Sequence, residues 1–476
     1  MSSACKAVAD PVHGTIQLTP LETKIISTRA FQRLRQVKQL GLANMVFPGA
    51  DYSRFSHCLG VCHVTGRILD ALNTKRPGII SPAEQDRYRL AGLLHDVGHY
   101  PFSHATEDAL KDHFSAKLLE PASGASDPIP SAGAGGDKYI NHEKVGILTL
   151  REDAELNEIL AAAEIKPEEV YSIFARQQPT TKFANLISSD LDADRIDYLM
   201  RTARHTGLPY GAVDLEYLLA QLCLDSENLI CVHPKALRAV EHFLLARYFD
   251  YQQVSYHKTV AGLELVLKDV IRALLSEGHL KASGAEIEAQ IKDGTWASVD
   301  DAFALQLIRK LEKESLNGTT REKARAILER RPPKLVAAME RFATREVNDR
   351  NRWSLERKQT EEHKQRWAAH FGLAEELWYV WHKSEIGLTK IGPHVSVSEL
   401  GDGTVQGKAE QLVRVLVPST NSSIPIVDVE RSLMHVLAKY ALCSLRVYVV
   451  LPPSHEGRRA EIEKYIRKDL EGIAWI

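Results

Sequence analysis

The sequence lacks the features expected of a secreted disulfide scaffold or a membrane protein. Its six cysteines are too few and too scattered for a disulfide framework. The longest apolar stretch, residues 445–451, is interrupted by Arg446 and ends at a proline pair, well short of the ~20 residues that span a bilayer. The first ten residues contain no apolar core of signal-peptide length. We therefore expect a cytoplasmic protein with no membrane partner.

An excess of charge of one sign is also missing. The chain has 60 basic and 62 acidic side chains and a formal net charge of −2, so overall charge gives no indication of a nucleic-acid partner. The apolar fraction of 44% and the charged fraction of 26% are ordinary for a globular protein. A chain of 476 residues is long enough for a substantial core and for two or three domains.

Apolar residues recur at helical spacing over the first 275 residues. Cys58 and Cys62 lie one turn apart in this pattern and are interpreted as small packing residues. A short strand pair is expected within 227–232. Helices are predicted at 21–40, 57–74, 82–95, 104–119, 142–150, 153–163, 167–174, 181–202, 213–223 and 234–275.

The composition changes toward the C-terminus. Residues 276–370 are densely charged and are predicted to be helical, with a solvated or subunit-facing surface favoured over a nucleic-acid surface. From about residue 371, β-branched runs at 413–417 and 445–451 predict strands that flank a helix at 427–440, followed by a last helix at 456–471. The predicted fold is therefore mainly α, with a helical core at 1–275, a charged helical extension at 276–370 and a small α+β lobe at 371–476.

One internal segment has the composition of an unordered loop. Residues 120–137 are rich in Ala, Gly, Ser and Pro and cannot bury enough apolar surface to order themselves. A spacer between two catalytic segments is favoured over a lid.

Two histidines and two aspartates form the most informative constellation in the chain. His57 precedes one apolar helical run, the adjacent His95 and Asp96 close another, and Asp194 lies in a segment expected to turn one carboxylate inward from a helix. Such a set suits one divalent transition metal and leaves positions open for water and a substrate oxygen. Any one of these residues alone is better explained as a surface or core residue, but the four together favour a metal site.

The motifs around this constellation resemble those of a known enzyme family. They run in unbroken order from residue 10 to about 260: Asp10-Pro-Val-His-Gly, Phe31-Gln-Arg-Leu-Arg, Lys38-Gln-Leu-Gly, Val46-Phe-Pro-Gly-Ala, Arg54-Phe-Ser-His-Cys-Leu-Gly-Val, His95-Asp-Val-Gly-His-Tyr-Pro-Phe-Ser-His, His142-Glu and Asp192-Ala-Asp-Arg-Ile-Asp-Tyr. This set resembles the HD-domain deoxynucleoside triphosphate (dNTP) triphosphohydrolases, which include an animal enzyme with a sterile-alpha-motif domain and many bacterial members without one. Past residue 270 the likeness is limited to the order of elements.

The resemblance implies an HD core that cleaves a dNTP to deoxynucleoside and triphosphate by water attack at the α-phosphorus. It implies that His57, His95, Asp96 and Asp194 bind one Mn²⁺, Fe²⁺, Co²⁺, Ni²⁺ or Zn²⁺ ion, with Mg²⁺ as an ion that could accompany the substrate triphosphate. It also implies a homo-oligomer, with a tetramer favoured.

The resemblance further assigns roles to residues around the metal. Arg195 and Arg247 match positions that hold the polyphosphate tail, and Arg54 matches one nearer the sugar and the α-phosphate. Glu107 and His142 match a carboxylate–imidazole pair for acid–base chemistry, which is physically sound because a neighbouring carboxylate raises the pKa of an imidazole. The other assignments are His99 at a substrate phosphate, His104 near the sugar as a proton donor to the leaving 5′ oxygen, Tyr198 beneath the sugar where it disfavours a 2′-hydroxyl, and Gln39 and Leu40 near the sugar and base.

Three positions depart from the family pattern. The family carboxylate at Glu107 is often the shorter Asp. Thr202 is assigned to the substrate sugar, at a position where the animal enzyme has an acidic residue that reads the 3′-hydroxyl. The animal enzyme also has a guanine-reading acidic residue where this chain has Ser27. Because Gln32 and Arg35 keep their types, a nucleotide effector is still compatible with the sequence, but activation by a guanine nucleotide is not indicated.

Hydrolysis of dNTPs is therefore the leading prediction, and two alternatives stay open. One is an HD phosphodiesterase or nuclease that acts on other nucleotides or DNA ends; three candidate phosphate-binding arginines favour a triphosphate over it. The other is a nucleotide-sensing regulatory protein, against which the intact pair of Glu107 and His142 argues. Base preference, native metal and effector are not determined by the sequence.

Overall fold

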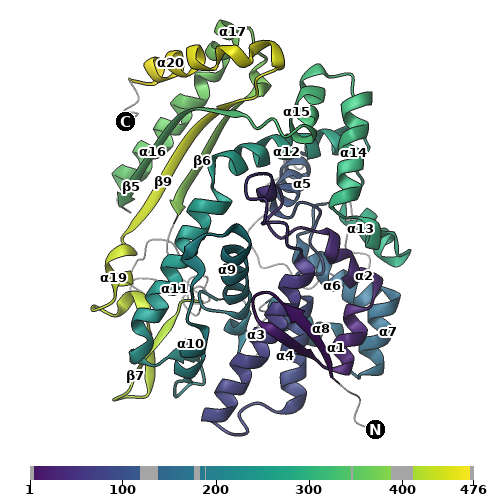
Figure 1. Ribbon diagram of the computed structural model, residues 1–476, viewed down its shortest axis with the longest axis vertical. Coiled ribbons are helices and arrows are strands. Elements are labelled where there is room, and N and C mark those ends of the chain that lie inside the picture. The colour runs from purple at the N-terminus through teal and green to yellow at the C-terminus, as the bar shows by residue number, and fades with distance from the viewer. Residues whose placement is uncertain are drawn as a thin grey trace.

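The computed structural model describes residues 5–117, 138–175, 183–187, 189–344, 347–386 and 411–471 (Figure 1). Helices dominate, and the described strands form three sheets with the orders β1-β2, β3-β4-β7-β8 and β5-β9-β6. The predicted mainly α fold with a smaller mixed C-terminal part is confirmed. The predicted loop at 120–137 lies outside the described residues. No described helix is both long and apolar enough to cross a membrane.

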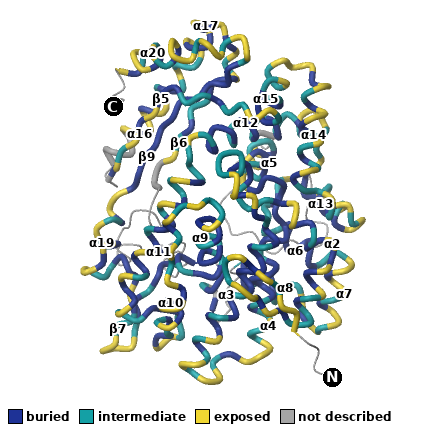
Figure 2. The backbone as a smooth tube through the Cα atoms, viewed as in Figure 1, coloured by how far each residue is buried: buried dark blue, intermediate teal, exposed yellow. Residues whose placement is uncertain are grey.

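Helix α3 (Arg54–Lys75) is the central helix of the N-terminal part. It packs on α4 (Pro82–Leu94) and α9 (Ala193–Thr206), and its Cys58 and Cys62 are fully buried, as the sequence predicted. Figure 2 shows buried residues along α9 and β9 and exposed ones around the periphery. The other helices of this part are α1 (Pro20–Ile26), α2 (Arg29–Gln32), α5 (His104–Lys117), α6 (His142–Glu152), α7 (Ala154–Ala162), α8 (Pro167–Phe174), α10 (Leu215–Gln221) and α11 (Leu237–Asp250).

The N-terminus begins with a hairpin that the sequence analysis missed. Strands β1 (Lys6–Asp10) and β2 (Gly14–Leu18) pair antiparallel. The single helix predicted at 21–40 is wrong, because the chain breaks it between α1 and α2. Thr28 caps α2 there by accepting a hydrogen bond from the Phe31 N–H, so its side chain starts a new helix in place of continuing the old one.

The helix predicted at 234–275 is also interrupted. Helix α11 passes into a π-helical turn at Tyr251–Ser255, and α12 (Lys258–Ser276) starts afresh with His257 as its cap. The predicted helix at 181–202 is likewise shorter at its start, because Asp192 caps α9. A π-helical turn widens the helix by one residue and is frequent at functional sites. Tyr251 and Ser255 both line the pocket described below.

The C-terminal half is built on a three-stranded antiparallel sheet. Its central strand β9 (Tyr440–Val449) lies between β5 (Lys334–Thr344) and β6 (Trp378–Ile386), and is buried from its second residue onward. The prediction that all of 276–370 is helical is wrong at β5. Its Ala, Met and Glu residues favour helix, but pairing along β9 overrides that weak propensity. The division into three domains stays a prediction.

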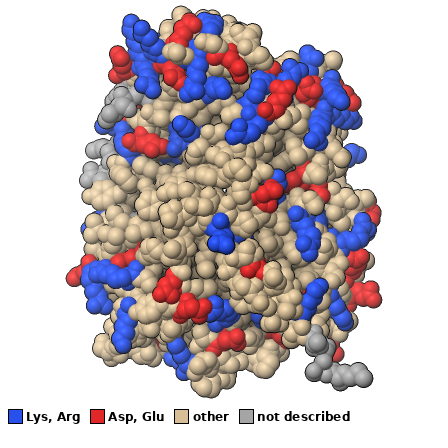
Figure 3. Space-filling view, viewed as in Figure 1, with Lys and Arg blue, Asp and Glu red and all other residues tan. Residues whose placement is uncertain are grey.

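The remaining elements surround this sheet or join it to the N-terminal part. The helix predicted at 427–440 is confined to α19 (Leu433–Leu437), because Ser432 caps its start and Tyr440 already begins β9. On the face in Figure 3 basic and acidic side chains are interspersed. The other elements are β3 (Leu222–Leu224), β4 (Ile230–Val232), α13 (Gly284–Lys292), α14 (Asp301–Glu314), α15 (Gly318–Leu328), α16 (Val347–Glu362), α17 (Lys364–Phe371), β7 (Arg414–Val417), β8 (Ser422–Pro425) and α20 (Arg459–Leu470).

Helix α12 contributes a fully buried side to the core of the C-terminal half, which yields a stability prediction. Leu267 has 0% exposure, whereas Leu316 has 100%. We expect Leu267→Ala to lower the free energy of unfolding by about 2–5 kcal/mol, because it removes buried methyl groups and leaves a cavity. Leu316→Ala, the matched control, should change it by less than about 0.5 kcal/mol. Urea denaturation would measure both, and equal effects would contradict the assigned core.

Candidate active site

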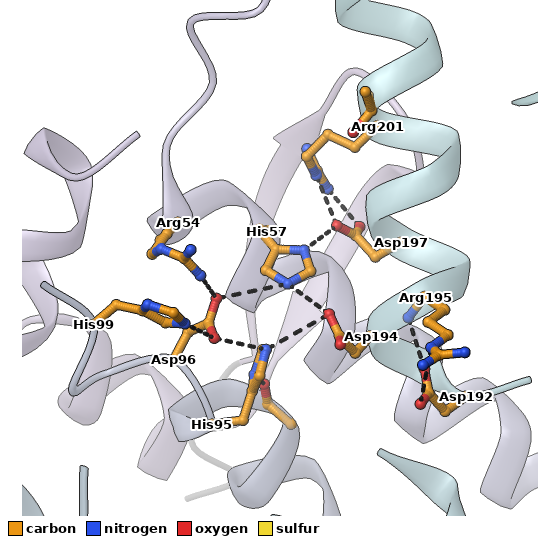
Figure 4. Close-up of polar contacts among 12 residues, drawn as sticks. Arg54, His57, His95, Asp96, His99, Asp192, Asp194, Arg195, Asp197 and Arg201 are labelled. Atoms are coloured by element: carbon orange, nitrogen blue, oxygen red, sulfur yellow. Dashed lines mark hydrogen bonds and ion pairs between the residues drawn. The ribbon is translucent and has the colours of Figure 1, made fainter. Parts of the chain in front are cut away.

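The four predicted metal ligands converge from three helices (Figure 4). One ligand atom each from His57, His95 and Asp96 lies within 4.8 Å of the others. The carboxylate of Asp194 joins them, with Oδ1 3.0 Å from His57 Nε2 and 3.8 Å from His95 Nε2. His57 lies in α3, His95 and Asp96 follow α4, and Asp194 lies in the first turn of α9. Residues almost 140 positions apart therefore meet at one point.

The free nitrogens of the two histidines fit a metal. His57 Nδ1 lies 2.7 Å from an oxygen of Asp197, and His95 Nδ1 lies 2.8 Å from the carbonyl oxygen of Gly92. These acceptors place the ring protons on Nδ1, which leaves the lone pairs on Nε2. Both Nε2 atoms are buried without a hydrogen-bond partner. Two such nitrogens beside two carboxylates are a suitable donor set for a divalent transition metal.

Asp197 is a supporting residue that the sequence analysis missed. Besides the bond to His57, it receives two hydrogen bonds from Arg201, at 2.9 and 2.8 Å, and contacts His13 Nε2 at 2.7 Å. Arg201 in turn donates to Asp10 of the N-terminal hairpin at 2.8 Å. The signal was present in the sequence, because Asp194 and Asp197 are three residues apart and so share one helix face.

A glycine makes room for this arrangement. A Cβ atom on Gly60, which lies in α3 one turn after His57, would be 1.8 Å from Asp197 Oδ1. Any side chain there would displace the carboxylate that orients His57. The close packing of α3 on α9 therefore depends on glycine at this position.

A pocket of about 310 Å³ opens beside the ligand cluster. Eleven of the predicted site residues line it, together with seven residues that the sequence analysis did not predict. Gln39 Oε1 is buried without a partner in this lining and so is available to a ligand. The predicted lining residues are Gln39, Leu40, Arg54, His95, Asp96, His99, His104, His142, Asp194, Arg195 and Tyr198; the unpredicted ones are Tyr52, Glu143, Phe174, Ile187, Asp250, Tyr251 and Ser255.

Thr202 lies away from this pocket. It is fully buried, and its Oγ1 is 2.8 Å from the Oη of Tyr52. The structure therefore does not support the direct contact with a sugar that was predicted for Thr202, because Tyr52 stands in front of it. His57 is also absent from the lining, since it lies behind the other ligands with 0% exposure.

Glu107 and His142 form the predicted pair. His142 Nδ1 lies 3.0 Å from both carboxylate oxygens of Glu107, which also accepts from the Tyr139 hydroxyl at 2.9 Å. His142 stacks on His99 with ring centroids 4.0 Å apart. Burial lowers the pKa of His142, but the hydrogen bonds and charge of Glu107 outweigh it, so the pKa is raised above its ordinary value.

The three candidate phosphate-binding arginines are held by carboxylates. Arg54 pairs with Asp96 and donates to the Ser103 hydroxyl, which puts its positive charge beside a metal ligand. Arg195 from α9 and Arg247 from α11 both contact Asp190 Oδ1, at 2.8 and 2.9 Å. Arg195 lines the pocket, whereas Arg247 is one layer behind it.

Comparison with protein families agrees with this geometry. Residues 54–200, which include all four candidate ligands, match the model of the HD domain. This segment of the chain is therefore similar to HD domains. The HD segment begins at the first residue of α3 and ends within α9, so it contains both helices that hold His57.

Curated relatives are similar to this chain over part of their length. Uncharacterized protein YwfO of Bacillus subtilis is 32% identical over 280 residues, which is 58% of this chain and 58% of that protein. Deoxynucleoside triphosphate triphosphohydrolase SAMHD1 of Homo sapiens is 28% identical over 295 residues, 59% of this chain and 46% of that protein. This chain therefore spans about half the length of the curated relatives it matches.

Two solved structures share the fold. A phosphohydrolase from Bacteroides thetaiotaomicron has a TM-score of 0.67 at 20% identity, covering 94% of this chain and 100% of that one. A hypothetical protein from Aquifex aeolicus has a TM-score of 0.67 at 24% identity, covering 97% and 100%. At these identities the likeness establishes the fold alone.

The contact between Asp197 and His57 predicts a change in metal affinity. Asp197→Asn keeps the shape but removes the charge that holds the proton on His57 Nδ1, so we expect metal affinity to fall about 10–100-fold. A chelator competition assay with Zn²⁺ or Mn²⁺ would measure it. Asp225→Asn is a matched control, because Asp225 is also buried but accepts hydrogen bonds from the backbone N–H groups of Glu227 and Leu229. Unchanged affinity in Asp197→Asn, or an equal loss in the control, would contradict this role.

Proposed function

We propose that this HD protein hydrolyses dNTPs to deoxynucleoside and triphosphate by water attack at the α-phosphorus. The observation that carries the proposal is that His142, paired with Glu107, lines the same pocket as three of the candidate metal ligands and two arginines, Arg54 and Arg195. The relatives named as dNTP triphosphohydrolases give further support.

The residues of the pocket suit both the triphosphate and the sugar of such a substrate. A divalent metal, when bound by the four ligands, supplies charge neutralisation at the phosphate and a water of lowered pKa. Arg54 and Arg195 add positive charge where a triphosphate needs it, because two ionised aspartates already balance a divalent ion. Tyr198, one turn after Asp194 on α9, supplies a flat wall for the sugar.

The proposal assigns the general acid to His142. Glu107 occupies Nδ1, so Nε2 is the ring nitrogen that can deliver a proton to the leaving 5′ oxygen. Its raised pKa keeps the ring protonated over more of the neutral range. His104 is the second candidate for this step, but it is 75% exposed, and its Nδ1 lies 3.4 Å from Glu107. His99 stacks on His142 and contacts Asp96, which makes it a bridge between acid and metal site.

Several wider features remain predictions that the proposal includes. They are a cytoplasmic location, a homo-oligomer of tetrameric size, a nucleotide effector and the choice among Mn, Fe, Co, Ni and Zn as the metal.

A substrate panel tests the proposal. The metal-loaded protein is incubated with the four dNTPs, the four NTPs, bis(p-nitrophenyl) phosphate and single-stranded DNA, and products are separated by ion-exchange chromatography. The proposal expects triphosphate and deoxynucleoside from dNTPs only. Release of pyrophosphate or of mononucleotides from DNA would favour the phosphodiesterase or nuclease alternative, and binding without turnover would favour a sensor. Asp96→Ala is the control for a contaminating hydrolase.

The pair of Glu107 and His142 predicts a specific pH response. A group with a raised pKa is protonated below that pKa, so a general acid loses activity as the pH rises through it. His142→Ala should lose about 10²–10⁴ in turnover while it keeps the metal. Glu107→Gln should move the alkaline fall in kcat to lower pH, since the charge that raises the pKa of His142 is gone.

Glu143→Gln is the comparison for this pH response: the charge of Glu143 also raises the pKa of His142, but less than Glu107 does, so its shift should be the smaller of the two. It removes a neighbouring pocket carboxylate and leaves the hydrogen bonds between Glu107 and His142 in place. The pH profiles of kcat for the three proteins decide the matter. An unshifted profile in Glu107→Gln, or near-normal turnover in His142→Ala, would assign the acid to His104 or His99.

A further inference from the structure

One carboxylate in the pocket is not explained by metal binding or by acid–base chemistry. Asp250, the last residue of α11, lines the pocket and is 3% exposed. The other lining carboxylates are the ligands Asp96 and Asp194 and the neighbour of His142, Glu143. Among the described residues no basic side chain forms an ion pair with Asp250. Its hydrogen bond comes from the Tyr210 hydroxyl, which donates to Oδ1 at 2.6 Å.

Asp250 lies near the end of α9 that is farther from Asp194, because its partner Tyr210 follows Thr206, the last residue of that helix, by four positions. Its charge acts on Tyr52 and Tyr198, where it adds to the larger effect of burial in raising the pKa of both phenols. Tyr198 is four residues after Asp194 on α9, and Tyr52 bonds to Thr202 one turn further on. At 1.5 Å per residue, the part of α9 from Tyr198 to Thr202 lies about 6–12 Å along the helix axis from the ligand Asp194.

The chemistry of a carboxylate limits what can lie against Asp250. An ionised carboxylate accepts hydrogen bonds and repels phosphate, so the triphosphate must lie toward Arg54 and Arg195. Burial raises the pKa of Asp250 to about 7, and only Tyr210 and Arg247 oppose it. The Tyr210 hydroxyl occupies Oδ1 of Asp250. An uncharged hydrogen-bond donor of the substrate could therefore bind the other carboxylate oxygen, Oδ2. On a deoxynucleotide with its α-phosphorus at the metal site, the sugar donor at this range is the 3′-hydroxyl, since the 5′ oxygen is esterified and the 2′ position carries none.

We propose that Asp250 is a specificity-determining residue that accepts a hydrogen bond from the 3′-hydroxyl of the bound deoxynucleotide. This proposal rests on the dNTP triphosphohydrolase function proposed above. Asp250 thereby orients the sugar so that the triphosphate extends toward the arginines. Thr202, which lies behind Tyr52, takes no part in the contact.

Discrimination between two substrates tests this role. The rates kcat/KM for dATP and for 2′,3′-dideoxyadenosine triphosphate are measured with the wild type and with Asp250→Ala and Asp250→Asn. A hydrogen bond to a charged group corresponds to about 10–100-fold in favour of dATP in the wild type. We expect Asp250→Ala to reduce this preference to less than about twofold and Asp250→Asn to give an intermediate value. An unchanged preference in Asp250→Ala would overturn the proposal.

Tyr210→Phe and metal content are the controls. Tyr210→Phe removes the hydrogen bond to Oδ1 but keeps the carboxylate, so its preference for dATP should persist even if stability falls. Metal content of every variant should equal that of the wild type. A Tyr210→Phe variant that loses the preference as fully as Asp250→Ala would make Asp250 a packing residue and overturn the proposal.

A binding measurement distinguishes a failure of this proposal from a failure of the proposed function. If the wild type hydrolyses no dNTP, the proposed function is wrong, and calorimetric titration with the same two nucleotides then decides the role of Asp250. Tighter binding of dATP that disappears in Asp250→Ala supports the contact. Equal binding of both nucleotides, or no binding of either, overturns it.

Discussion

The imidazole of His57 lies between two carboxylates of a single helix. Asp197 binds its Nδ1 at 2.7 Å, while Asp194 lies 3.0 Å from its Nε2. This contact fixes how α3 and α9 face each other, because the ring is fully buried and cannot turn without losing both partners. Gly60 permits the approach of Asp197, and Arg201 ties that carboxylate to Asp10 in the N-terminal hairpin. A hairpin remote from the pocket opening thus helps to orient a metal ligand.

The pocket next to this cluster is lined by charged groups of both signs and by phenols. Positive side chains gather around the ligands and toward Asp190, where guanidinium groups from α9 and α11 meet on one oxygen. Asp250 and the phenols of Tyr52 and Tyr198 also line it. Cationic groups together with hydrogen-bonding groups suit a molecule that is anionic at one end and carries hydroxyl groups at the other, which is the pattern of a nucleotide.

The sequence predicted which candidate ligands come together but not the residues that support them. His57, His95, Asp96 and Asp194 could be named from the sequence because their motifs are local and their chemistry is specific. Asp197 and Asp250 were missed because their meaning comes from partners far along the chain: His57 is 140 residues from Asp197, and Asp250 meets Tyr210 across 40 residues. Thr202 was placed by likeness to a relative, and only the packing of Tyr52 in front of it shows that it does not reach the pocket.

The errors in the fold have similar causes. Strand β5 was predicted as helix since Ala, Met and Glu favour helix locally, whereas β9 decides the outcome by pairing with residues that lie 96 to 115 positions away in the sequence. The long helix at 234–275 was predicted from continuous apolar spacing, which does not reveal the π-helical turn at 251–255 or the cap at His257. Apolar periodicity therefore located the helices but not their interruptions, and two of the pocket walls come from one of those interruptions.

The central claim is that water attacks the α-phosphorus of a dNTP at this site, and isotope tracing tests it most directly. A dNTP is hydrolysed by the metal-loaded protein in H₂¹⁸O, and the products are examined by mass spectrometry. The account predicts ¹⁸O in the triphosphate and none in the deoxynucleoside. Label in the deoxynucleoside, or a labelled mononucleotide with pyrophosphate, would contradict it.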